Sequence, residues 1–212
     1  MTRQEQEIAT IKERNIKCKL SDADVDRITK MAGEVGLSVG ELLENFIGDL
    51  VGGTYSNGSD ERDLAENWFE RCWFGMFPDN TLLRYLLDEI YQDPYEFLVL
   101  LNDIRGSIHI LKDYKEHPEA DEEIDLRADL KDDILCLKES NEEYHEIIDP
   151  FLERAKDKPT FDLVKELNLV VTWVKEKMDL LNEPYPFDDE IMKVKEQQEF
   201  ISNLEEFTKE LL

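Results

Sequence analysis

The sequence is poor in cysteine, histidine and basic residues, and it has no long apolar run. Only three of its 212 residues are cysteines, at Cys18, Cys72 and Cys136. Their odd number and wide spacing do not fit a disulfide framework or a cysteine metal site. Because each cysteine stands among apolar neighbours, we expect buried thiols without a redox role.

Histidine is equally scarce, which limits the catalytic and metal chemistry open to the chain. None of the three histidines belongs to a His-Glu-x-x-His zinc motif. Glu142-x-x-His145 has the spacing of a di-iron helical bundle, but that site needs a second copy of the motif and further glutamates. A glycine-rich phosphate loop and a Gly-x-Ser-x-Gly nucleophile elbow are also missing. We therefore predict a protein that is not an enzyme, with no catalytic residue, cofactor or metal.

No segment contains the uninterrupted run of about 18 apolar residues that a membrane-spanning helix needs. The N-terminal residues Met-Thr-Arg-Gln-Glu-Gln-Glu also lack the apolar stretch of a secretory signal. We expect a cytoplasmic protein with no membrane partner. A hydrophobic content of 41% is nevertheless enough for a folded core.

Basic residues are outnumbered, with 25 Lys and Arg against 51 Asp and Glu and a net charge of −26. A chain of this charge repels nucleic acid as a whole and attracts basic proteins. The acids are concentrated between Asp113 and Asp149, where fifteen of them accompany four bases. Residues 1–20, by contrast, carry a balance of +2.

What the sequence does contain begins with an alternating pattern near the N-terminus. In Ile16-Lys17-Cys18-Lys19-Leu20, apolar and basic residues alternate, which predicts a short strand with one face buried. No other strand is evident, and an isolated strand of this length is not stable. We therefore predict a homodimer in which the strand pairs with a second copy of the chain.

Two helices are expected after this strand. The first begins at the N-cap residues Ser21 and Asp22 and ends at Gly36. The second begins with a capping box, Ser38-x-x-Glu41, and ends before Gly52-Gly53. The order strand, helix, turn, helix therefore occupies residues 15–51.

These residues resemble the ribbon-helix-helix family through Ile16-x-Cys18-x-Leu20 and Gly36-Leu37-Ser38-x-x-Glu41-Leu42-Leu43. The resemblance implies an antiparallel ribbon in the DNA major groove and a phosphate held by the amides at the start of the second helix. The DNA-binding residues that it implies are Asn15, Lys17, Lys19 and Ser38.

The charge of this stretch departs from that of a DNA reader. Residues 21–51 hold seven acids and two bases, whereas a DNA-binding surface usually places Arg or Lys near its phosphate contacts. A head that contacts DNA, a head that only dimerises and an ordinary helical hairpin therefore remain as alternatives.

We predict three segments: a ribbon-helix-helix-like dimerisation head over 1–53, an aromatic-rich helical connector over 54–117 and an acidic helical bundle over 118–212. Trp68, Trp73 and Phe77 in the connector fit either an aromatic core or an interface with a partner. A long helix is expected from Pro94 to His117. The predicted fold class is mainly α.

Two helices of the bundle carry coiled-coil-like apolar rows, here called seams. The first seam contains Leu130, Ile134, Leu137, Asn141, Tyr144, Ile148 and Phe151. The second contains Val164, Leu167, Val171, Val174, Met178 and Leu181. A third helix is expected from about Phe187, and Asn141 is expected to set the register. The pattern fits seams that close within one chain as well as between two.

Carboxylates between the seam positions are expected on the outer face of the first seam helix. We call them the acidic ridge: Asp121, Glu122, Glu123, Asp125, Asp129, Asp132, Asp133, Glu139, Glu142, Glu143 and Glu146. The ridge fits either a solvated face or a surface that imitates DNA phosphates for a basic protein partner.

In charge and size only, the chain resembles acidic phage and mobile-element inhibitors such as anti-CRISPR proteins. We therefore expect a non-catalytic inhibitor of a nuclease or another nucleic-acid enzyme, for example a CRISPR effector nuclease. The alternative is a ribbon-helix-helix transcriptional regulator or antitoxin whose acidic helical body binds a partner.

Overall fold

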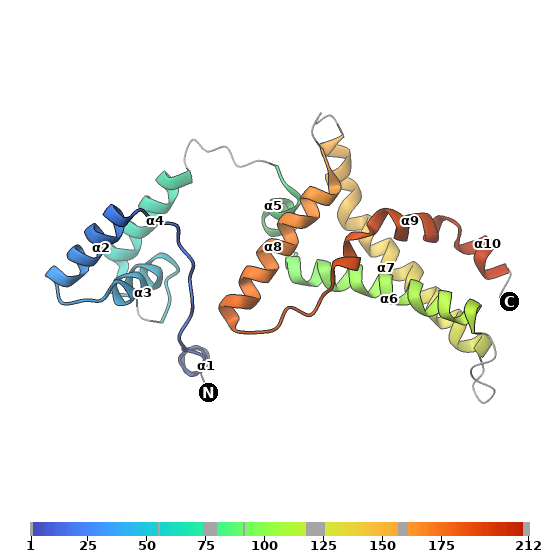
Figure 1. Cartoon of the computed structure of the whole chain (residues 1–212), viewed down its shortest axis with the longest axis horizontal. Helices are drawn as coiled ribbons and strands as arrows, with labels where there is room; N and C mark the ends of the chain where they lie inside the picture. Colours follow the sequence, from blue (N-terminus) through green and yellow to red (C-terminus); the bar gives the residue numbers. More distant parts are fainter. Residues whose placement is uncertain are drawn as a thin grey trace. The chain divides into compact units, whose positions relative to one another are not determined.

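The computed structural model describes residues 2–54, 56–73, 80–90, 92–117, 126–156 and 161–209, and within these ranges every regular element is a helix. The prediction of a mainly α protein is therefore confirmed. The chain divides into two compact units, Met1–Asp79 and Asn80–Leu212 (Figure 1). No helix of the described residues is long and apolar enough to cross a membrane.

The first unit contains helices α1 (Arg3–Ala9), α2 (Asp22–Glu34), α3 (Val39–Leu50) and α4 (Ser59–Trp73). Ser21 caps α2, and Ser38 and Glu41 form the predicted capping box at the start of α3. Gly36 ends the α2 region with a φ of 79°, and the amide of Leu37 donates to the carbonyl of Ala32 at 2.9 Å. This is the Schellman pattern, which needs a residue in the left-handed region.

The predicted N-terminal strand is absent from the described residues. Residues 11–20 have no regular secondary structure, and Ile16 and Leu20 are 54% and 59% exposed. The alternating pattern is present in the sequence, but a strand also needs a second backbone to pair with. No segment among the described residues of the single chain pairs with it, so the prediction of a strand is wrong for the chain by itself.

The second unit begins with the short helix α5 (Leu82–Arg84) and a π-helical turn, η1 (Tyr85–Glu89). Three long helices follow, α6 (Pro94–Glu116), α7 (Leu126–Ala155) and α8 (Leu163–Leu181). In place of the single third helix predicted from Phe187, the chain forms a 3₁₀ turn, η2 (Asp189–Met192), then α9 (Val194–Ser202) and α10 (Leu204–Lys209).

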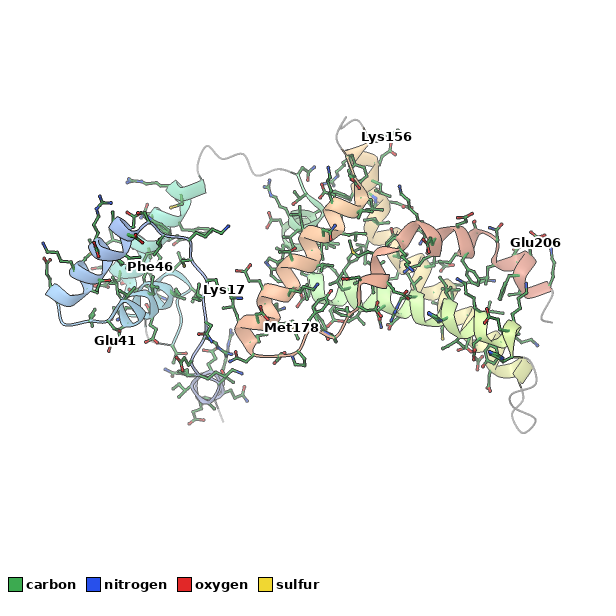
Figure 2. The ribbon with its side chains drawn as sticks, in the orientation of Figure 1. Lys17, Glu41, Phe46, Lys156, Met178 and Glu206 are labelled. Carbon is green, nitrogen blue, oxygen red and sulfur yellow. The ribbon has the colours of Figure 1, made fainter. Side chains whose placement is uncertain are left out.

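Both seams face the core of the second unit. Along α7 the seam residues Leu130, Leu137, Tyr144, Ile148 and Phe151 are buried. Along α8 the seam is buried from Leu167 to Met178, although Val164 at its start is exposed; Figure 2 labels Met178. The long helix α6, which runs beside α7, contributes Phe97 to a stacked ring pair with Tyr144 at 6.2 Å. The seams therefore close within the chain.

Candidate functional site

The described part of the acidic ridge lies on the outside of α7. Six of its carboxylates are exposed and one, Asp133, is half-buried; the six are Asp129, Asp132, Glu139, Glu142, Glu143 and Glu146. None of the seven pairs with a cation among the described residues. The other predicted members, Asp121, Glu122, Glu123 and Asp125, lie outside the described residues.

The spacing of these seven carboxylates can be compared with DNA. An α-helix rises 1.5 Å per residue, so residues 129–146 span about 26 Å and carry roughly one carboxylate per 4 Å. B-DNA carries about one phosphate per 3.4 Å along each strand. The carboxylates of the ridge are therefore spaced about as closely along the helix as the phosphates of one DNA strand, while Lys131 and Lys138 in the same stretch reduce its net charge from −7 to −5.

A polar bridge fixes α7 against α9 on the flank of the ridge. The side-chain amide of Gln198 donates to Oδ1 of Asn141 at 3.1 Å, and its oxygen lies 3.1 Å from Nε2 of His145. Nδ1 of His145 lies 3.0 Å from Asp149. Asn141 thus binds a neighbouring helix of the same chain. These hydrogen bonds hold α7 against α9 and so help to keep the carboxylates of the ridge in fixed positions.

The residues predicted to read DNA are exposed, but they do not form a ribbon. Asn15, Lys17 and Lys19 all lie in the irregular segment between α1 and α2; Figure 2 labels Lys17. At the start of α3, the Glu41 carboxylate accepts hydrogen bonds from the Ser38 amide and hydroxyl, both at 2.8 Å. These bonds, the amide first, lower the pKa of Glu41.

A carboxylate therefore occupies the position where the ribbon-helix-helix resemblance placed a phosphate. Two negative groups repel each other at such close range, so the Glu41 carboxylate disfavours a phosphate at the start of α3.

The aromatic group predicted as core or interface is partly described. Trp68 on α4 meets Phe46 on α3 edge to face at 5.1 Å, yet Trp68 remains exposed. It thus has one face in a contact between helices and one available to a partner. The side chain of Trp73 and the whole of Phe77 lie outside the described residues.

The cysteines correct one prediction. Cys18, Cys72 and Cys136 are all exposed and unpaired, so the expectation of buried thiols is wrong. Apolar neighbours in sequence do not determine burial on a helix, where successive residues point in different directions. Within the described ranges, no group of three or more His, Cys, Asp or Glu side chains is placed to hold a metal ion.

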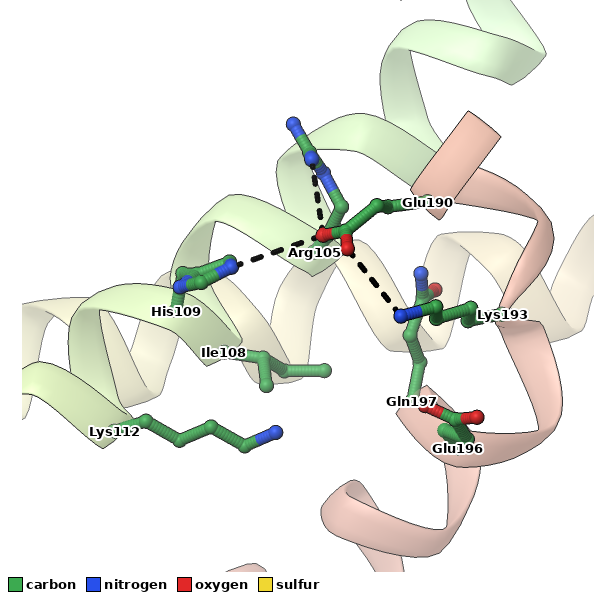
Figure 3. A pocket seen from close by; sticks show the side chains of 8 residues that line it. All are labelled: Arg105, Ile108, His109, Lys112, Glu190, Lys193, Glu196 and Gln197. Atoms are coloured by element: carbon green, nitrogen blue, oxygen red, sulfur yellow. Dashed lines mark hydrogen bonds and ion pairs between the residues drawn. The ribbon is translucent and has the colours of Figure 1, made fainter. Parts of the chain in front are cut away.

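A pocket between α6 and the η2–α9 segment was not predicted from the sequence. Its volume is about 180 Å³, and its lining consists of Arg105, Ile108, His109, Lys112, Glu190, Lys193, Glu196 and Gln197. Figure 3 shows Glu190 between three basic side chains, with the Glu190 carboxylate 3.7 Å from Arg105, 3.9 Å from His109 and 3.3 Å from Lys193. The sequence indicated this pocket only through the spacing of three basic residues, which places Arg105, His109 and Lys112 on one face of a helix.

Comparison of the chain with protein-family models, curated proteins and solved structures finds no match.

Proposed function

We propose that this chain is a non-catalytic binding protein, of phage or mobile-element type, that inhibits a nucleic-acid enzyme such as a CRISPR effector nuclease. The acidic ridge on α7 would occupy the basic channel that otherwise holds nucleic acid. The observation that carries this proposal is the row of exposed carboxylates, unpaired among the described residues, on one helix of 30 residues.

The physical basis is complementarity between a fixed negative row and a basic groove. A channel that binds DNA is lined with Lys and Arg at the spacing of phosphates, and it gains much of its affinity from releasing counterions. Carboxylates on a rigid helix offer similar charges and lose little conformational freedom when they bind. Long-range attraction by a chain of charge −26 would also accelerate the encounter.

Charge reversal on the ridge tests the proposal. The test variant combines Asp132→Lys, Glu139→Lys, Glu143→Lys and Glu146→Lys. The immobilised wild-type protein should capture a basic nucleic-acid enzyme from host lysate, duplex DNA should displace that enzyme, and the variant should not capture it. Its helical content, measured by circular dichroism, should stay unchanged because all four side chains are exposed.

A matched control separates this surface from total charge. The control variant reverses the same number of exposed acids on other segments of the second unit, at Glu183, Glu199, Glu205 and Glu206. This control variant should still capture the partner protein from the lysate. Equal capture by the ridge variant, or a partner that duplex DNA does not displace, would contradict the proposal.

A second candidate function concerns the first unit. We propose that it pairs with a second copy of the chain as a ribbon-helix-helix-like head, with Asn15, Lys17 and Lys19 available to DNA. The supporting observation is an exposed apolar surface: the buried hydrophobic residues described in this unit are Ala32 and Ala65, whereas its exposed ones include Ile16, Leu20, Val25, Met31, Val35, Leu43, Ile47, Leu64 and Trp68.

Two buried alanines contribute little to the stability of a unit of this size, because burial of apolar surface is the main stabilising term. A second copy would cover the apolar residues and give the Ile16–Leu20 backbone a partner strand. An exposed apolar surface of this extent is typical of an interface.

Sedimentation velocity on the full chain tests the dimer. Wild-type protein should sediment as a dimer, and the double change Ile16→Lys with Leu20→Lys should give a monomer because lysines would enter the shared interface. The change of Ile8→Lys with Ile11→Lys, at isoleucines that are also exposed but precede the alternating pattern, should leave the dimer intact. A monomeric wild-type protein would rule the second copy out.

DNA binding needs a separate measurement. A gel-shift series with increasing salt should show a steep loss of affinity if the lysines contact phosphates or bases, and Lys17→Glu should abolish the shift. Lys30→Glu, on α2 and outside the ribbon segment, serves as the control. A dimer that produces no gel shift would show that the first unit serves to join two chains and does not bind DNA.

A further inference from the structure

The pocket between α6 and α9 has hydrogen-bonding groups that the described chain does not satisfy. Gln197 is only 5% exposed, yet neither its side-chain nitrogen nor its oxygen has a partner there, and the same holds for Nε of Arg105. Buried polar groups in folded proteins are almost always hydrogen-bonded, because an unsatisfied one lowers stability. These three atoms are therefore available to bind a hydrogen-bonding ligand in the pocket.

The unsatisfied groups are mainly donors. Arg105 Nε and the Gln197 amide nitrogen can only donate, and the Gln197 oxygen is the single unsatisfied buried acceptor. Lys112 adds a further donor at the wall of the pocket, where its Nζ lies 5.2 Å from the centre of the Phe200 ring. No described carboxylate pairs with Lys112. A ligand in this pocket must consequently supply hydrogen-bond acceptors.

The charges of the pocket favour an anion, in contrast to the strongly acidic molecule around it. Arg105, Lys112 and Lys193 line it together with two acids, Glu190 and Glu196, so its lining carries one excess positive charge. Asp188 holds Arg105 at 2.6 Å, and Glu190 lies 3.7 Å from Arg105 and 3.3 Å from Lys193. Lys112, which Figure 3 shows on the side away from Glu190, is thus the cation with no carboxylate partner among the described residues.

The neighbouring helix end adds to this preference. The first turn of α9 borders the pocket through Lys193, Glu196 and Gln197, and no side chain caps it. The start of a helix carries partial positive charge and exposes free amides, and both features favour negative groups nearby.

We propose that this pocket binds a small organic anion, with its phosphate or carboxylate group at Lys112 and hydrogen-bonding groups at Arg105 Nε and the Gln197 amide. The volume of about 180 Å³ is below that of sites for drug-sized ligands, which limits the occupant to a few carbon atoms. The site is separate from the acidic ridge and does not depend on the function proposed for it.

Titration of the isotope-labelled full chain, followed by the side-chain amide resonance of Gln197, tests the site. The probes are inorganic phosphate, glycerol phosphate and malate, at low ionic strength. We expect saturable shifts of the Gln197 amide with at least one probe. Preference for the phosphates or for malate would identify the anionic group, and the absence of saturable binding by all three would overturn the proposal.

The chain offers a matched pair of lysines for the mutational test. Lys112 and Lys115 lie on the same helix and each sits over a phenylalanine, at 5.2 and 5.0 Å from the ring centres, but only Lys112 lines the pocket. Lys112→Gln should weaken the bound probe by about tenfold or more because a charge-assisted hydrogen bond is lost. Lys115→Gln should leave the affinity nearly unchanged.

Equal losses in the two lysine variants would show general attraction of anions to a basic patch and would overturn the site. Gln197→Leu, of similar size, should also weaken binding, by about fivefold or more, while leaving the fold intact because it removes two unsatisfied atoms. Unchanged affinity in Gln197→Leu would remove Gln197 from the site. If this variant fails to fold, the two exposed lysines still decide the result.

Discussion

Gln198 and His145 show how single side chains connect helices in the second unit. Nδ1 of His145 lies 3.0 Å from Asp149 on its own helix, and Nε2 lies 3.1 Å from the Gln198 oxygen on α9. The Gln198 amide in turn donates to Asn141 on α7 at 3.1 Å. Gln198 therefore joins α9 to α7 through two polar contacts.

Asp49 is the residue with the clearest pH dependence in the first unit. Its carboxylate accepts from the Asn57 amide at 2.7 Å and from the Asn57 side chain at 3.0 Å. These bonds, the backbone amide first, hold the pKa of Asp49 below its ordinary value. The stabilisation is therefore complete above the pKa of an unfolded Asp, at about 4, and is lost as pH falls through the lower folded value.

We predict that Asp49→Asn lowers the urea midpoint of the first unit at neutral pH, because the charge-assisted bonds are weakened. The difference from the unsubstituted protein should shrink as the pH falls below about 4, where Asp49 itself becomes protonated. Tryptophan fluorescence measures this in a Trp173→Phe background, which leaves the tryptophans at positions 68 and 73 as reporters. A difference that stays constant into strong acid would contradict the assignment.

At the scale of elements, α7 has one face in the core and one face in solvent. Leu137 is completely buried, whereas Leu135, two residues earlier, is 53% exposed. The two positions lie on opposite sides of the helix because each residue turns the chain by about 100°.

We predict that Leu137→Ala destabilises the second unit by about 2–5 kcal/mol, through lost burial and a residual cavity. Leu135→Ala, the same chemical change on the same helix, should stay within about 0.5 kcal/mol of the original. Urea unfolding followed by Trp173, with the other two tryptophans replaced by Phe, measures both. Similar losses of stability in both variants would show that the side of α7 that carries Leu135 is buried as well as the seam.

At the scale of the whole molecule, the charge of −26 opposes folding. Ion pairs offset little of it: most of the pairs in the described residues join exposed side chains three or four positions apart, such as Arg27 with Asp24 and Lys30 with Glu34. Pairs of this kind contribute little to stability. Repulsion among the excess carboxylates therefore remains, and salt screens it over about 10 Å at 0.1 M.

We predict that added sodium chloride raises the thermal midpoint of the protein, because it weakens the repulsion more in the compact state than in the unfolded chain. The variant with four ridge acids reversed to lysine should depend less on salt, since it carries less excess negative charge. Differential scanning fluorimetry over a salt series measures both proteins. A midpoint that falls or stays level with salt would contradict a dominant role for repulsion.

The helical class and the ends of α2, α3 and α6 were predictable from the sequence alone. Caps act within one turn, so Ser21, Ser38 and Gly36 fixed the ends of α2 and α3 through local hydrogen bonds. The seams were equally readable, because burial of an apolar row follows from helical periodicity alone. The exposed carboxylates of the ridge then followed as the opposite face.

Features that depend on contact between distant segments of the chain were visible only in the folded structure. The alternation in residues 16–20 could not show that no described segment of the chain pairs with it, and apolar sequence neighbours could not show that three cysteines are exposed. The pocket joins Arg105 and Lys112 on α6 to Gln197 on α9. Local periodicity carries no information on such distant contacts, because they depend on how the helices pack against one another.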